Sequence, residues 1–293
     1  MSRLKGESLK IIAIIMIGWT CFSIADVITK HLSASYNPSV IVVLGAVVNC
    51  LVISLWILWD RGVKGFLTPK WKLFSLRALM TGITSFSIVN ALSRIPIADI
   101  YGITFSSPFF IVILAAFLLK EQIGQHRWIA IIAGFIGVLV LVGPQYQELN
   151  IGLTYASIGT TSIAIGTIVL RKIGTNNVYM PLLILYAYLG MLCVNFPMAL
   201  PDLQIIPTPD LYFVFVNAGL LLTAISLTTY AFAHAKSTAS VAPFVYIQAI
   251  WGVVFGYFFF DDVPTTATII GLLIVISAGL YMIYRENQLG QTS

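Results

Sequence analysis

The chain has 293 residues, of which 59% are hydrophobic and 9% are charged, and its formal net charge is +5. A soluble domain usually contains about 25% charged residues, so this composition excludes an ordinary soluble protein. It indicates a protein integral to the membrane, whose basic residues flank apolar helices and do not form a surface for nucleic acid.

Ten apolar runs predict ten transmembrane helices, because a helix needs about 20 apolar residues to cross a bilayer. The first run carries Asp26 and lacks a small-residue cleavage site, so we interpret it as a span and not as a signal peptide. The connections are short, and no soluble domain is expected. The predicted spans are residues 9–29, 38–59, 73–93, 97–119, 127–143, 151–170, 178–200, 210–233, 239–260 and 264–284.

The Lys and Arg residues predict how these spans are oriented. With the N-terminus in the cytoplasm, fourteen of the 16 Lys and Arg residues fall on the cytoplasmic side. Lys30 and Arg94 fall on the other side. The positive-inside rule therefore predicts that both termini are cytoplasmic.

The two halves of the sequence superimpose after a constant shift of 141 positions, which indicates an internal duplication. We predict two five-span repeats, residues 1–146 and 147–293. Because five is odd, the second repeat enters the membrane with inverted topology, as in many secondary transporters whose halves rock to open either side in turn. Matched positions include Ile24 with Ile165, Phe105 with Tyr246, and Leu139 with Leu280.

Three charged residues are candidates for gating or coupling, because charges in spans usually face a cavity or pair with each other. Asp26 lies one turn before Lys30, so an interfacial ion pair and a gating or cation-binding carboxylate are both open interpretations. Asp99 opens the fourth span, where the helix dipole favours a capping carboxylate and direct substrate contact is the alternative. Arg94 is expected either to pair with Asp99 or Asp26 at an outer gate, or to be solvated.

Two amides and six aromatic residues are candidates for substrate binding. Asn90 and Gln248 lie in spans, where an amide must be hydrogen-bonded to a neighbouring helix or to a ligand. Pockets for organic solutes combine apolar walls with a few polar anchors, while packing and interface belts are the alternative role of aromatic residues in spans. The aromatic candidates are Trp19, Tyr101, Phe105, Tyr230, Tyr246 and Trp251.

No metal site, disulfide or cofactor is expected. Cys21, Cys50 and Cys193 fall inside spans, and no Cys or His pair has the spacing of metal ligands. His234 and Lys236 are expected to anchor the cytoplasmic end of a span, and proton coupling is the alternative role of His234.

Small residues in two spans predict close packing of helices. Gly252 and Gly256 stand four positions apart in the ninth span, and Ala130, Gly134 and Gly137 stand in the fifth. Such residues let helix backbones approach each other. For the fifth span, a seam between two copies in a homodimer is the alternative interpretation.

Several motifs occur together: ALSRIPIAD at residues 91–99, then Ser107-Pro108, Lys120-Glu121 and Arg127-Trp128. With the segment GWTCFSIADVITK of the first span, they resemble the drug/metabolite transporter superfamily, specifically its bacterial ten-span EamA-type members. The resemblance implies an all-α fold of two inverted five-helix repeats around a central cavity, in the bacterial inner membrane. Relatives often carry an arginine in the second span, whereas residues 43–49 here contain no charge, which weakens the expectation of an anionic substrate.

The sequence therefore predicts a secondary active transporter for a small amphipathic metabolite. The resemblance implies an amino acid, a derivative such as S-adenosylmethionine, or a nucleoside- or vitamin-like solute. The expected partners are this solute, the lipid bilayer, and a coupling ion or a counter-substrate. The alternatives are an intramembrane enzyme, disfavoured because neither HExxH nor GxSxG occurs, and a membrane interaction protein without transport activity.

Overall fold

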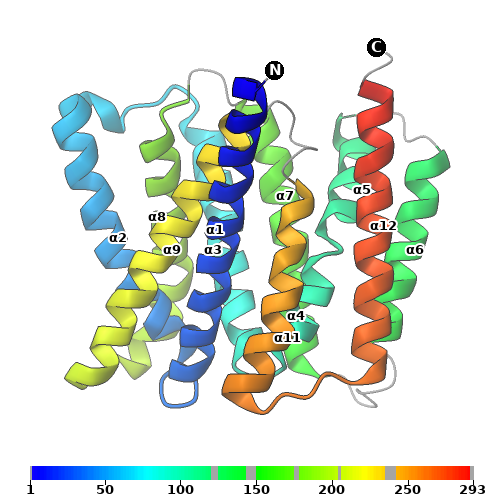
Figure 1. Ribbon diagram of the computed structural model, residues 1–293. Coiled ribbons are helices and arrows are strands. Elements are labelled where there is room, and N and C mark those ends of the chain that lie inside the picture. Colours follow the sequence, from blue (N-terminus) through cyan, green and yellow to red (C-terminus); the bar gives the residue numbers. More distant parts are fainter. Residues whose placement is uncertain are drawn as a thin grey trace. The chain divides into compact units, whose positions relative to one another are not determined.

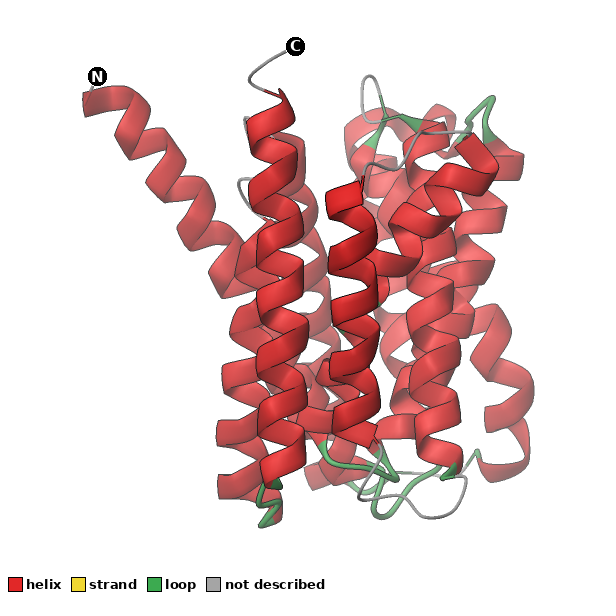
Figure 2. Ribbon diagram, turned by 90° about the vertical axis from the view of Figure 1, so that its right-hand side faces the viewer, coloured by secondary structure: helices red, strands yellow, loops and turns green. Residues whose placement is uncertain are grey.

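The computed structural model describes residues 2–119, 125–142, 150–174, 178–203, 206–234 and 242–290. Within these ranges the elements are helices and no strand occurs (Figures 1 and 2). Lys120, Glu121 and Lys236 lie outside the described residues, as do the side chains of Arg127 and His234. The helices are α1 (Ser2–Leu32), α2 (Pro38–Arg61), η1 (Gly62–Phe66), α3 (Trp71–Leu92), α4 (Ile97–Thr104), α5 (Ser107–Leu119), α6 (Gln125–Val142), α7 (Ile151–Ile173), α8 (Met180–Ala199), η2 (Leu200–Asp202), α9 (Thr208–His234), η3 (Ala242–Tyr246), α11 (Ile247–Phe260) and α12 (Thr266–Gly290).

These helices confirm the ten predicted membrane segments. In the described part of the chain, seven helical stretches are long and apolar enough to cross a membrane: Lys10–Leu32, Pro38–Phe66, Trp71–Leu92, Ile97–Leu114, Ile151–Leu170, Met180–Asp202 and Thr208–Ala231. The other three predicted spans correspond to shorter apolar helices, Trp128–Leu141, Phe244–Phe260 and Thr266–Tyr281. The chain is an all-α, multi-pass membrane protein.

The fourth predicted span is broken, which its continuous hydropathy did not predict. α4 ends at Thr104 and α5 begins at Ser107. The Ser106 hydroxyl donates to the carbonyl of Ile103 at 2.6 Å, and the Ser106 amide donates to the same carbonyl at 3.0 Å. The hydrogen bond from the Ser106 side chain competes with the regular backbone hydrogen bonds of the helix. Pro108 has no backbone N–H and so cannot donate one of those bonds.

The ninth span changes helix type at the position that matches this break. η3 ends at Tyr246, and α11 continues from Ile247. The shift of 141 positions places Phe105, which follows α4, on Tyr246, which precedes α11. The two predicted repeats therefore depart from a regular α-helix at matched positions.

The chain forms two compact units. Unit 1 comprises Met1–Ile24, Ile95–Asn150 and Thr223–Ser293, and unit 2 comprises Ala25–Arg94 and Ile151–Leu222. Each unit combines segments from both halves of the sequence, and α1 and α9 contribute to both units.

In unit 2, α2 and α8 run antiparallel, because the start of each helix contacts the end of the other. Asn37, the N-cap of α2, donates from Nδ2 to the Asp202 carboxylate at 2.6 Å. At the opposite end of α2, the Tyr179 hydroxyl donates to the Asp60 carboxylate at 2.7 Å. The Arg61 guanidinium lies 3.8 Å from the centroid of the Tyr179 ring. α2 and α8 are the second spans of the two predicted repeats.

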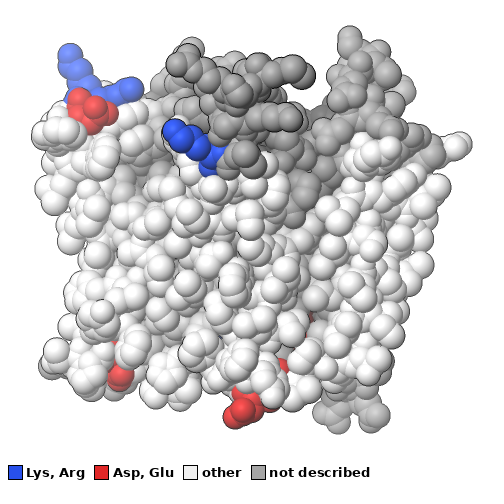
Figure 3. Space-filling view, in the orientation of Figure 1, with Lys and Arg blue, Asp and Glu red and all other residues white. Residues whose placement is uncertain are grey.

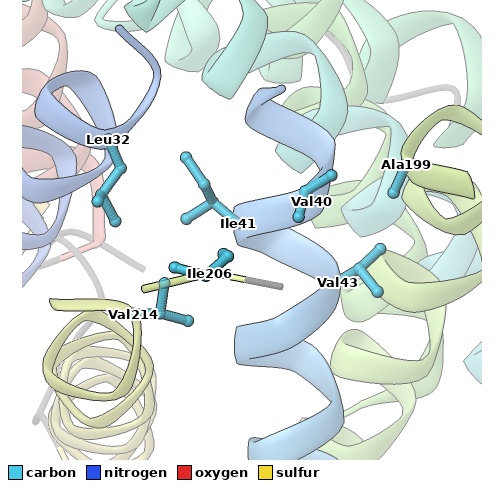
Figure 4. Packing of buried hydrophobic residues seen from close by; sticks show 7 residues of the cluster. All are labelled: Leu32, Val40, Ile41, Val43, Ala199, Ile206 and Val214. Atoms are coloured by element: carbon cyan, nitrogen blue, oxygen red, sulfur yellow. The ribbon is translucent and has the colours of Figure 1, made fainter. Parts of the chain in front are cut away.

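Small residues bring α3 and α8 of unit 2 together. A Cβ atom at Gly190 of α8 would clash with the backbone carbonyl of Ala78 in α3, and one at Gly82 of α3 would clash with the carbonyl of Gly190. Close backbone approach of this kind drives helix association in membranes. Unit 2 also contains a cluster of buried apolar side chains that pack against one another. Its members are Leu32, Val40, Ile41, Val43, Ala199, Ile206 and Val214 (Figure 4).

In unit 1, α6 and α12 are in contact and also run antiparallel. Gly137, near the end of α6, faces Gly271, near the start of α12: a Cβ atom at Gly271 would lie 2.6 Å from the carbonyl oxygen of Gly137. Ala130, earlier in α6, and Ala278, later in α12, line one apolar groove of about 570 Å³. The start of α1 and the end of α12 lie at the same end of this unit (Figure 1).

Large apolar side chains are exposed on the described helices. Trp59 is 84% exposed, Phe117 is 77% exposed and Leu139 is 69% exposed. On the face drawn in Figure 3, few charged side chains are visible among the described residues. Extended apolar exposure marks a surface that meets lipid or a partner, and in a multi-pass membrane protein the lipid hydrocarbon covers it.

Candidate functional site

Three of the predicted aromatic residues form a continuous line at the helix break of unit 1. Tyr101 and Phe105 of the α4 region stack with ring centroids 6.1 Å apart. The Phe105 ring meets the Tyr246 ring edge to face, at 5.1 Å between centroids. All three side chains are buried. The two irregular spans are therefore joined through aromatic side chains at the points where their helices are interrupted.

Two hydroxyl groups of α1 hold these elements in place. The Trp251 indole Nε1 donates to Thr20 Oγ1 at 3.0 Å, and the Tyr101 hydroxyl donates to Ser23 Oγ at 3.3 Å. Thr20 and Ser23 stand three residues apart and so share a helix face. Sequence reasoning missed both; the signal that could have found them is this pair of hydroxyls on one face of an apolar helix.

Three buried side-chain polar atoms of unit 1 have no hydrogen-bond partner among the described residues. They are Trp19 Nε1, Thr104 Oγ1 and Tyr246 Oη. Trp19 packs with Phe244 against the buried side chain of Ile15. Native proteins leave few buried polar atoms unpaired, and such atoms often point to a ligand or to an ordered water.

The remaining aromatic and amide candidates of unit 1 differ in exposure. Gln248 is 8% exposed and lies one helical turn before Gly252. A Cβ atom at Gly252 would lie 2.7 Å from the Tyr101 ring, so α11 needs a glycine there to approach α4. Tyr230 is 48% exposed, and its position on α9 fits the interface role as well as a binding role.

Asp99 is buried near the start of α4. Its side chain is 1% exposed, and its Oδ1 accepts a hydrogen bond from the Thr268 hydroxyl of α12 at 3.0 Å. Asp99 and Thr268 line a small pocket together with Asp262 of the α11–α12 turn. Thr268 was also missed by sequence reasoning, because it stands in the last span with no charged or aromatic neighbour. Among the described residues, no group of three or more His, Cys, Asp or Glu side chains could hold a metal ion.

In unit 2, Asn90 and Arg94 contact each other at the end of α3. The Arg94 guanidinium donates to the Asn90 backbone carbonyl at 2.7 Å and to Asn90 Oδ1 at 3.0 Å. The Asn90 amide donates to the Phe86 carbonyl at 2.8 Å, and Arg94 lies 5.2 Å from the Tyr155 ring centroid. In this state both ends of the Asn90 amide are therefore used within the protein.

The structure leaves the predicted outer gate untested. Asp26 lies in α1, half-buried, with Lys30 one turn later. Asp26 and Arg94 belong to unit 2, whereas Asp99 belongs to unit 1. The gate formed by these three residues stays a prediction, as do the binding roles of the amides and aromatic residues.

The chain is similar to known transporters. Residues 9–143 match the EamA-like transporter family. An S-adenosylmethionine uptake transporter of Rickettsia bellii is 27% identical over 280 residues, which cover 93% of this chain and 94% of the relative. A riboflavin transporter of Vibrio cholerae is 25% identical over 272 residues, covering 91% of this chain and 90% of the relative.

A solved structure shares the fold. One crystal structure superimposes with a TM-score of 0.63 at 14% sequence identity, covering 97% of this chain and 99% of that one. At this identity the likeness concerns the fold alone.

Proposed function

We infer from its membership of the EamA-like transporter family, within the drug/metabolite transporter superfamily, that this protein transports a small organic metabolite. The family match and the names of the relatives confirm the resemblance predicted from the motifs. The observation that carries the function is similarity over nine tenths of the chain to S-adenosylmethionine and riboflavin transporters. Both named solutes are amphipathic, which agrees with a site built from aromatic walls and a few polar atoms.

The mechanism we propose is alternating access between two inverted repeats, residues 1–146 and 147–293. Two pairs of repeat-equivalent helices support this arrangement. α2 packs antiparallel to α8, and α6 packs antiparallel to α12. Antiparallel packing of equivalent spans is expected when the second copy is inserted with opposite topology.

The proposed roles follow the chemistry of the residues. Asp26, Arg94 and Asp99 form and break an outer gate as the transporter changes state. Asn90, Gln248 and the aromatic residues hold the solute; for Asn90, this requires that its bonds to Arg94 and Phe86 open in another state. The aromatic residues are Trp19, Tyr101, Phe105, Tyr230, Tyr246 and Trp251.

The proposed setting is the bacterial inner membrane, with both termini in the cytoplasm. We assign no enzymatic step to the protein. A coupling ion or an exchanged solute supplies the driving force, and a homodimer remains a proposal to be tested by mass measurement in detergent.

Uptake by liposomes that contain the purified protein tests the function. The pool of solutes holds S-adenosylmethionine, riboflavin, nucleosides, amino acids and organic acids, and mass spectrometry identifies what enters. The assay is run under an imposed proton or sodium gradient and with preloaded counter-solutes. Accumulation of one solute above protein-free liposomes is the expected result. No accumulation of any solute in every arm contradicts transport of a metabolite in these classes.

A further inference from the structure

We propose that the groove between α6 and α12 binds one anionic phospholipid, with an acyl chain in the groove and the phosphate at the end where α6 begins. The groove lies in unit 1, and none of the residues assigned to the gate or to the solute lines it. Binding of the lipid is therefore separate from transport and does not depend on which solute is carried.

The groove is concave, apolar and long. Its volume is about 570 Å³, and cavities of about 300–1,000 Å³ hold small organic ligands. α12 lines it from Ile270 to Tyr281, a distance of about 16 Å at 1.5 Å per residue. The lining side chains are apolar except for the hydroxyl groups of Ser277 and Tyr281. An extended hydrocarbon chain therefore fits the length and the chemistry of the groove.

Small side chains and a close helix contact shape the groove. Ala130 and Ala133 of α6 and Ser277 of α12 line it, so little side-chain volume fills the space between the two helices. Further along α6, the two backbones come together at Gly137, whose carbonyl oxygen would lie 2.6 Å from a Cβ atom at Gly271. On α6 the groove is therefore confined to the part near the start of the helix (Figure 1).

Aromatic side chains indicate that this end of the groove lies at the membrane surface. Trp128, near the start of α6, is 44% exposed, and Tyr281 and Tyr284 of α12 are 38% and 59% exposed. Trp and Tyr side chains concentrate where the hydrocarbon of the bilayer meets the lipid headgroups. A lipid chain that enters the groove beside Tyr281 therefore carries its headgroup at the level of these aromatic residues.

The same end of the helix pair favours a negative charge. α6 begins at Gln125, and the N–H groups of a first helical turn, which have no partner within the helix, attract anions such as phosphate. Arg127 belongs to that turn. Arg285 stands four residues after Tyr281, so α12 places position 285 on the face that lines the groove. The acidic residue beside it, Glu286, stands about 140° around the helix from Tyr281.

This charge pattern favours a lipid over a second copy of the chain. In a two-fold dimer whose copies enter the membrane in the same orientation, the same ends of the two helix pairs lie together. The arginines of one copy would then meet those of the other, and like charges that face each other are unfavourable. An anionic lipid neutralises them instead. In the orientation that we propose, this end faces the cytoplasmic leaflet, whose anionic lipids attract basic residues near the surface.

Removal of the two arginines tests the headgroup part of the assignment. The double variant Arg127→Gln and Arg285→Gln keeps polar side chains at both positions and removes their charge. Lys64→Gln with Lys72→Gln is the matched control, because it removes two exposed positive charges from unit 2.

Filling the groove tests the acyl-chain part. Ala133→Phe places a large side chain in the groove and leaves both arginines in place. Gly219→Phe is its control, since it adds the same ring at an exposed position of α9, where nothing lies within 4 Å of a Cβ atom.

Lipid binding is measured by native mass spectrometry of the full-length protein released from a mild detergent. The probes are phosphatidylglycerol and phosphatidylethanolamine with identical acyl chains, added at equal concentration. Glycerol 3-phosphate is the third probe, because it carries a phosphate without a chain. Gel filtration shows whether each variant is folded and whether it is a monomer.

We expect wild type to bind one phosphatidylglycerol more tightly than phosphatidylethanolamine, and not to bind glycerol 3-phosphate. Each arginine substitution should lower the affinity for phosphatidylglycerol about fivefold, the worth of one basic residue near an anionic lipid surface. The double variant should therefore lose the preference for the anionic lipid. Ala133→Phe should lower the affinity for both phospholipids, while both controls should bind as wild type does.

Several results would overturn the assignment. Equal affinity of wild type for the two phospholipids, or unchanged affinity in the double arginine variant, would show that the headgroup is not recognised. Unchanged affinity in Ala133→Phe would place the lipid elsewhere, and tight binding of glycerol 3-phosphate would assign the charge to a free phosphate. A dimer that Ala133→Phe dissociates would place a second copy in the groove. Solute uptake is measured separately, so the proposed transport function stands or falls independently of these results.

Discussion

The rings of Phe105 and Tyr246 touch edge to face at 5.1 Å between centroids, and these two residues occupy matched positions in the two predicted repeats. A residue that contacts its own repeat counterpart lies next to the axis that relates the copies. α6 and α12, which are equivalent helices of the two predicted repeats, are also in contact. The shift of 141 positions converts the pair Gly137 and Gly271 into Ala278 and Ala130, which line one groove between these helices.

A methyl group at Gly190 should loosen unit 2. In Gly190→Ala the new Cβ would clash with the Ala78 carbonyl, which is backbone and cannot rotate away. Overpacking of this kind costs about 1–3 kcal/mol, and we expect a lower melting temperature in detergent. Gly219→Ala is the control, since nothing lies within 4 Å of a Cβ at that position in α9. Equal melting temperatures for Gly190→Ala and Gly219→Ala would contradict the close α3–α8 contact.

The hydrogen bond between Trp251 and Thr20 should appear as a coupling in a double-mutant cycle. Trp251→Phe and Thr20→Val each remove one partner of the 3.0 Å bond. Hydrogen bonds between membrane helices average about 0.6 kcal/mol, so we expect a coupling of that order in the free energy of unfolding. Additive effects of the two substitutions would show that the bond contributes nothing to stability.

Asn37 has two roles that substitution can separate. Its Oδ1 accepts from the Ser39 amide at 2.9 Å as an N-cap, and its Nδ2 donates to Asp202 at 2.6 Å. Asn37→Ala removes both and should destabilise the protein by about 1–2 kcal/mol. Asn37→Ser keeps a capping oxygen but is too short to reach Asp202, so its unfolding free energy should fall between those of wild type and Asn37→Ala. If Asn37→Ser is as unstable as Asn37→Ala, the cap contributes little.

Asp26 should be needed for transport and not for folding. Asp26→Asn keeps the size of the side chain and removes its charge, so this residue can no longer form an ion pair in the gate that we propose. We expect normal insertion and a normal gel-filtration profile, but no solute uptake. Uptake at the wild-type rate in this variant would remove Asp26 from the mechanism.

The contact between Tyr36 and Asp210 should weaken at alkaline pH. The Tyr36 hydroxyl donates to the Asp210 carboxylate at 2.5 Å, and this bond raises the pKa of Tyr36 above its ordinary value of about 10. Its contribution to stability is therefore fully present below pH 10 and is lost as the pH rises through the raised pKa. The melting-temperature difference between wild type and Tyr36→Phe should shrink as the pH is raised above 10. A difference that stays constant up to pH 11.5 would show that the hydrogen bond does not stabilise the fold.

Much of the architecture could be predicted, because long apolar runs in the sequence indicate membrane-spanning helices directly. All ten apolar runs became helical segments, since a backbone in lipid must satisfy its hydrogen bonds internally. The break after Thr104 was missed because residues 100–119 are apolar on both sides of it. The sequence Ser106-Ser107-Pro108 was the available signal. A serine side chain can hydrogen-bond to a nearby backbone carbonyl and so compete with the backbone hydrogen bonds of the helix.

The candidate site could be predicted less well, because its contacts join residues far apart in sequence. The aromatic candidates Tyr101, Phe105 and Tyr246 do contact one another, although the sequence predicted them only as separate candidates. No local pattern predicts that Thr268 bonds to Asp99 across 169 positions. No local pattern predicts that the Arg94 guanidinium donates a hydrogen bond to Oδ1 of Asn90 either, because that bond depends on the backbone conformation at the end of α3.

The helix pair α6 and α12 also bears on the energetics of the transport cycle. One end of the pair is closed by Gly137 and Gly271, whereas the matched end carries Ala278 and Ala130 beside an open groove. Two identical halves would oblige the inward-open and outward-open states to have the same free energy. The matched positions carry glycine in one pair and alanine in the other, so the two halves are not identical here. In the alternating-access mechanism that we propose, substitutions at these four positions should therefore shift the resting preference for one side of the membrane.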